Sequence, residues 1–169
     1  MKKVGLILLV LLFVVPSATQ AQKFKYGHVN GEAVLRKMPE IQLADTTLKT
    51  LVKELEDQVK KMNDEYTAKV TEYKAKEATM SDLIKKTQAD QINDLNKKMQ
   101  QFQIDAQETI NQKRVELYTP AIEKFNNALK SVAKKNGYSF IIDNSKGVLL
   151  YYDEKDDVTN LIEKELGIK

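Results

Sequence analysis

Residues 48–70 read LKTLVKELEDQVKKMNDEYTAKV, and this stretch decides the fold. Its apolar side chains recur in steps of three and four, and most positions between them are charged or polar. A narrow apolar stripe on an otherwise polar helix is typical of a coiled-coil seam rather than of a helix inside a globular core. With Glu77 as one polar interruption, the seam runs through Leu48, Val52, Leu55, Val59, Met62, Tyr66, Val70, Tyr73 and Met80.

A second seam with the same spacing follows, and no glycine or proline lies between Pro39 and Pro120. Two seams of similar length predict a helical hairpin over residues 40–136, with helices of roughly 66 and 72 Å. We place its reversal near residues 81–87, because Thr87 and Asp90 have the spacing of a capping box. The alternative is a single unbroken helix of about 145 Å. The second seam consists of Ile92, Leu95, Met99, Phe102, Ala106, Ile110, Leu117, Ala121, Phe125, either Ala128 or Leu129, and Val132.

Strand-like segments flank this hairpin. Residues 22–39 are expected to hold a short strand and one or two helical turns, and residues 137–169 a β-hairpin and a closing helix. The β-hairpin would pair residues 138–143 with 148–152. Three strands per chain leave exposed edges and apolar runs without cover, so we predict a homo-oligomer with a shared β-body. Its expected residues are Phe24, Tyr26, Val29, Phe140, Ile141, Ile142, Val148, Leu149 and Leu150.

The predicted fold class is therefore mainly α with a small β part. A long antiparallel helical hairpin, a coiled-coil tentacle, projects from a small β-body shared between subunits.

Residues 1–21 are interpreted as a cleavable signal peptide. Lys2 and Lys3 precede an apolar run too short to span a bilayer, and Thr19 and Ala21 are small residues at the positions that signal peptidase requires. We expect cleavage after Ala21 and export to a periplasm, with a retained anchor as the alternative. Without Lys2 and Lys3 the chain has 25 basic and 24 acidic side chains, a net charge of +1.

The composition leaves little room for catalysis. The chain has no cysteine and one histidine, which excludes thiol chemistry and disulfides and makes zinc fingers and catalytic triads very improbable. We find no catalytic constellation and no metal or cofactor site, so the chain is not expected to be an enzyme. His28 is expected to lie in or beside the sheet.

The order of these motifs resembles the Skp/OmpH family of periplasmic chaperones. The resemblance rests on Tyr26-Gly27-His28-Val29-Asn30, Val34-Leu35 before Met38-Pro39-Glu40, the charged hairpin, Pro120-Ala121-Ile122, residues 133–143 and the closing helix at Asp157-Val158-Thr159. It implies a jellyfish-shaped trimer with a β-body and three helical arms around a cavity. It also implies a holdase that keeps unfolded outer-membrane β-barrel proteins from aggregating, without ATP.

Several residues are candidates for this activity. Pro120 lacks an amide hydrogen, so it should kink the second helix, either as a flexing point or as a static bend. Leu83 and Ile84 either close the hairpin or contact clients, and closure is favoured. Lys85-Lys86 and Lys97-Lys98 near the tip could meet anionic headgroups. Paired lysines on an exposed helix more often serve solvation, so we expect weak or no contact with anionic lipids. The candidate client contacts near the arm tip are Met80, Leu83, Ile84 and Met99.

Two other functions remain open. One is a structural coiled-coil protein of the envelope that docks on one defined partner. The other is nucleic-acid binding, which is disfavoured because basic and acidic residues alternate and no aromatic platform lies among the lysines.

Overall fold

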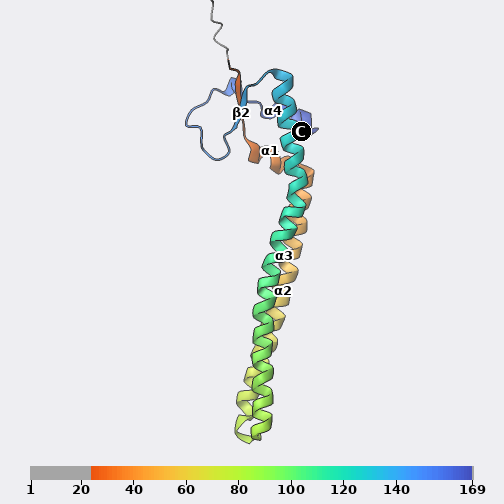
Figure 1. Cartoon of the computed structure of the whole chain (residues 1–169), viewed down its shortest axis with the longest axis vertical. Helices are drawn as coiled ribbons and strands as arrows, with labels where there is room; N and C mark the ends of the chain where they lie inside the picture. Colours follow the sequence, from red (N-terminus) through yellow and green to blue (C-terminus); the bar gives the residue numbers. More distant parts are fainter. Residues whose placement is uncertain (1–23, 169) are drawn as a thin grey trace, which may run out of the picture.

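The computed structural model describes residues 24–168, so the predicted signal peptide lies outside the described residues. Helix α2 (Pro39–Lys76) and helix α3 (Asp82–Asn136) run side by side as one long arm, and a small body sits at one end of it (Figure 1). Their 38 and 55 residues correspond to about 57 and 82 Å. The predicted fold class, mainly α with long helices and a small β part, is confirmed.

The two predicted seams form the contact between α2 and α3. Every seam position is buried or half-buried, whereas nearly all positions between them are exposed. Packing is tightest at the root of the arm, where α3 buries Ala121, Phe125, Ala128 and Val132. Farther out most seam residues are only half-buried. The arm therefore holds together through a thin apolar contact, as the narrow stripe predicts.

The reversal of the arm lies earlier than the predicted residues 81–87. A short 3-10 helix, η1 (Glu77–Thr79), ends α2, and Ser81 caps α3 by accepting a hydrogen bond from the Ile84 amide at 3.4 Å. Thr87 does not start a helix, because it lies in the second turn of α3 and its hydroxyl donates to the Leu83 carbonyl at 2.9 Å. The serine hydroxyl at residue 81, rather than the threonine at 87, is the N-cap.

The body contains a two-stranded parallel sheet. Strand β1 (Tyr26–Val29) pairs with strand β2 (Phe140–Asp143), with Tyr26 opposite Phe140 and Val29 opposite Asp143. Parallel neighbours need a long crossover, and here the whole arm is that connection. Helices α1 (Gly31–Lys37) and α4 (Thr159–Leu166) pack beside the arm root. The fully buried side chains at the centre of this core are Val29, Val34, Met38, Val158 and Ile162.

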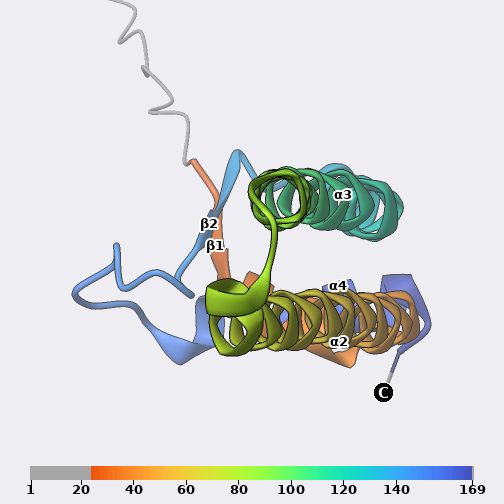
Figure 2. The same ribbon diagram turned by 90° about the horizontal axis from the view of Figure 1, so that it is seen from below.

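The predicted β-hairpin is wrong in this single chain. Residues 148–152 form no strand, and the segment between β2 and the 3-10 helix η2 (Glu154–Asp156) loops away from the body (Figure 2). Strand β1 pairs with β2 on one edge and forms an isolated bridge between His28 and Asp157 on the other. The second edge of β2 stays unpaired within residues 24–168, and the apolar run lacks cover, with Val148 69% and Leu150 100% exposed.

Candidate functional site

The tip of the arm exposes apolar side chains. Leu83 is 76% exposed and Ile84 is also exposed, while Met80 is half-buried beside them. Because the chain reverses before residue 82, Leu83 and Ile84 lie in the first turn of α3 and face solvent. The favoured expectation that they close the hairpin is therefore wrong, and their side chains are accessible.

Met99 does not lie at the tip. It lines a groove between α2 and α3 farther along the arm, with a cavity volume of about 610 Å³. We call this the mid-arm groove; its apolar lining is Val52, Leu55, Val59, Met99, Ala106 and Ile110. Ala106 is buried, and its single methyl group leaves space that a larger seam residue would fill. The structure thus separates Met99 from the other three candidates.

A row of side-chain amides runs along α3 next to this groove. Gln103 and Gln107 line the mid-arm groove and also a second, shallower hollow on the outer side of α3. Ile104, which is 62% exposed, lies in that second hollow. The sequence patterns did not predict this surface, because Ala121 and Ala128 occupy the same seam as Ala106 and are tightly packed.

Two polar contacts join α2 and α3 on either side of Pro120. Tyr118 donates its hydroxyl hydrogen to Asp45, and Lys124 pairs with Glu40. The bond to Asp45 raises the pKa of Tyr118, and the bond from Lys124 lowers the pKa of Glu40. Helix α3 continues through Pro120, so the proline is held between two cross-links at the arm root.

The body carries an exposed apolar surface. Phe24 and Phe140 stack with ring centroids 6.1 Å apart, and both rings remain accessible. Of the nine residues predicted for a shared body, six are exposed in the single chain: Phe24, Tyr26, Phe140, Ile142, Val148 and Leu150. Ile141 packs partly against the core and Leu149 is half-buried. Val29 belongs to the chain's own core, so it is not available to another subunit.

His28 is buried beside the sheet, as predicted. Its Nε2 lies 3.1 Å from the carbonyl oxygen of Asp153, and its Nδ1 lies 3.0 Å from the side-chain amide nitrogen of Asn144. With the Asn144 amide as donor to Nδ1, the other ring nitrogen, Nε2, carries the hydrogen that reaches the Asp153 carbonyl. The Tyr152 ring packs on it at 4.3 Å. His28 thus holds both ends of the exposed loop that carries residues 148–151.

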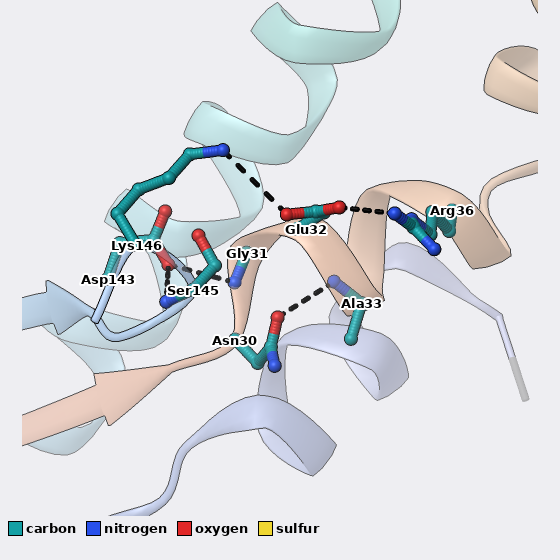
Figure 3. Close-up of polar contacts among 8 residues, drawn as sticks. All are labelled: Asn30, Gly31, Glu32, Ala33, Arg36, Asp143, Ser145 and Lys146. Atoms are coloured by element: carbon teal, nitrogen blue, oxygen red, sulfur yellow. Dashed lines mark hydrogen bonds and ion pairs between the residues drawn. The ribbon is translucent and has the colours of Figure 1, made fainter.

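Asp143 joins the end of β2 to the start of α1 (Figure 3). Its Oδ1 accepts hydrogen bonds from the Gly31 amide at 3.1 Å and the Ser145 amide at 2.9 Å. Burial acts to raise the pKa of Asp143, but the bonds from Ser145 and Gly31 outweigh it and the pKa is lowered. Nearby, Glu32 pairs with Arg36 and, at 3.7 Å, with Lys146. These contacts fasten the start of α1 to the end of β2.

Within residues 24–168, histidine, aspartate and glutamate side chains do not gather in a group of three that could hold a metal ion. Over the same residues, no helix is long and apolar enough to cross a membrane.

Comparisons with known proteins agree with this architecture. The model of a family described as outer membrane protein (OmpH-like) matches residues 25–166. An uncharacterized protein from Aquifex aeolicus (strain VF5) is 31% identical over 146 residues, which cover 83% of this chain and 85% of that protein. A crystal structure of a candidate outer membrane chaperone (OmpH-like) from Caulobacter crescentus CB15 superposes with a TM-score of 0.72 at 12% identity. The match covers 85% of this chain and 83% of that one. The family match spans nearly all described residues, and the chain therefore belongs to the Skp/OmpH (OmpH-like) family.

Proposed function

We propose that this chain is a periplasmic, ATP-independent holdase chaperone that keeps unfolded outer-membrane β-barrel proteins from aggregating. The observation that carries the proposal is the arm itself. It is long, its seam is thin, and it exposes apolar groups at its tip and along α3. Many weak contacts on an adaptable surface suit a binder that accepts varied clients and releases them. Membership of the OmpH-like family and the fold shared with a candidate outer membrane chaperone support the same conclusion.

The proposal includes a homotrimer whose bodies join. The exposed apolar surface of the body, above all Val148 and Leu150, needs cover in water, and contiguous exposed apolar surface marks an interaction site. Three arms around a common axis would then enclose the cavity for clients. We further propose that the predicted signal peptide delivers the chain to the periplasm.

The test of the function is aggregation of an unfolded client. A urea-unfolded outer-membrane β-barrel protein is diluted into buffer with and without the chain starting at Gln22, while light scattering and the mass of soluble complexes are recorded. We expect suppressed scattering and a complex of three chains with one client. An equal concentration of an unrelated helical protein is the control. Unchanged scattering across several clients and salt concentrations would refute the holdase and favour a structural protein with one fixed partner.

The oligomer has a separate test. Leu150→Asp places a charge in the proposed interface, and Gln58→Asp places the same charge on an exposed position of the arm. Sedimentation should give a trimer for the unsubstituted chain and for Gln58→Asp, and a smaller species for Leu150→Asp. A folded monomer of the unsubstituted chain at micromolar concentration would refute the trimer.

A further inference from the structure

The mid-arm groove lies beside a segment of α3 with an unusual composition. Between residues 99 and 112 only Asp105 and Glu108 are charged, while five glutamines and one asparagine occupy the segment. The flanking parts of α3 are far more charged, with seven charged residues among 82–98 and eight among 113–136. The loss of charge is therefore confined to the part of α3 that borders the groove.

Both charges in this segment are engaged by neighbouring amides. Gln101 donates to Asp105 at 2.8 Å, and Gln112 donates to Glu108 at 3.0 Å. Gln107 makes only a long contact of 3.4 Å to Asn111. The two glutamines that border the groove, Gln103 and Gln107, thus lie on a surface where each of the two carboxylates accepts a hydrogen bond from another glutamine.

From these observations we propose that the mid-arm groove holds one apolar side chain of an extended, unfolded polypeptide, while Gln103 and Gln107 hydrogen-bond its backbone. This inference rests on the proposed holdase function and assigns a client-binding site within each single arm. A side-chain amide donates and accepts, so it can pair with the N–H or the C=O of any residue. Binding of this kind depends little on the client's sequence.

The amides favour an extended polypeptide over two other occupants, a helix from a second copy and a lipid acyl chain. A helix from a second copy satisfies its backbone hydrogen bonds internally and can meet the glutamines only through its side chains, whereas an extended chain presents N–H and C=O groups that need partners. An acyl chain offers no donors or acceptors for the amides. Its anionic headgroup would need clustered cations, but Glu56 lies with Lys60 and Arg114 on the groove rim, and Lys60 already pairs with Asp64 at 3.1 Å.

Site-specific photo-crosslinking tests where the client lies. The full mature chain carries p-benzoylphenylalanine at the position of Gln103 or, as the control, of Thr109. Thr109 is exposed, lies outside both hollows and is about 200° around the helix from Gln107. With a urea-unfolded outer-membrane β-barrel protein as the probe, we expect several times more crosslinked client from Gln103. Equal yields, or a crosslink to a second copy of the chain, would overturn the proposal.

Substitutions test how much the groove and its glutamines contribute to client affinity. Ala106→Leu fills the groove, and the pair Gln103→Ala with Gln107→Ala removes the amides without harming helix propensity. Each should weaken client binding about tenfold, the loss expected for one well-buried apolar contact or a comparable pair of hydrogen bonds. The control pair, Gln58→Ala with Gln91→Ala, lies on exposed parts of the arm and should leave affinity within about twofold.

The outcomes separate this inference from the function on which it rests. If the unsubstituted chain suppresses aggregation and the paired glutamine substitutions leave affinity unchanged, the holdase stands and the groove site is refuted. The groove site is likewise refuted if Ala106→Leu retains both its helical signal and its affinity for the client. If the unsubstituted chain captures no client, both proposals fail together.

Discussion

Replacing Ile162 by alanine should loosen the body without disturbing the arm. Ile162 is fully buried in α4 and belongs to the core cluster with Val29, Val34 and Val158. Truncation of a buried isoleucine to alanine costs about 2 to 5 kcal/mol. A loss of about 3 kcal/mol would be a large part of the roughly 5–15 kcal/mol that holds an ordinary domain together. Helix α4 has only eight residues and is too short to persist undocked, so it should detach first.

Leu161 provides the matched control. It is adjacent on the same helix and 39% exposed, so Leu161→Ala should cost about 1 kcal/mol or less. Both variants are unfolded in urea at one fixed protomer concentration, followed by far-ultraviolet circular dichroism, because oligomer stability depends on concentration. Hydrogen exchange should show faster opening of residues 159–166 in Ile162→Ala. Equal losses for the two variants would refute the assignment of α4 to the core.

Three further predictions concern the strands and the arm root. Gly27→Ala should destabilise the body by about 1 to 3 kcal/mol, because the added methyl would meet a Val158 methyl at 2.8 Å; an unchanged urea midpoint would contradict this contact. The pKa of Asp143 is lowered in the folded chain. Its stabilising effect is therefore present above about pH 4 and is lost as the pH falls through the pKa that the carboxyl group has in the folded chain. Stability measured against pH should therefore decline less in acid for Asp143→Asn than for the unsubstituted chain, and parallel curves would contradict the linkage. Pro120→Ala restores a donor to the Glu116 carbonyl and should slow hydrogen exchange around the arm root; unchanged exchange and client range would rule out a flexing point.

The arm could be predicted because its information is local and repeated. Each step of three or four residues in the two seams specifies the same helix face, and the structure buries or half-buries every such position. The predicted reversal of the arm lay a few residues too late in the chain, because Ser81 and Thr87 both offer a capping hydroxyl. Only the packed arm shows that Ser81 caps α3 while Thr87 bonds back to Leu83.

The body was harder to predict because its strands pair with distant partners. Residues 148–152 have the composition of a strand, but composition alone does not decide whether a segment pairs, and in the single chain they do not pair with β2. Their pairing in an oligomer stays a prediction. The mid-arm groove was not predicted for another reason, because the space at Ala106 depends on how closely α2 approaches α3 there.

The parallel pairing of β1 and β2 also bears on how this chain folds. Tyr26 and Phe140 are opposite each other although 114 positions separate them. Closing so long a loop from a disordered chain costs about 2 kcal/mol more than closing one of about ten residues, and such distant contacts slow folding. Zipping of α2 onto α3 from the Glu77–Ser81 turn removes this cost, because it carries the two strand segments toward each other. The arm would then assemble first and act as the nucleus of the sheet, so β1, the first structured segment to be synthesised, would be among the last to find its partner.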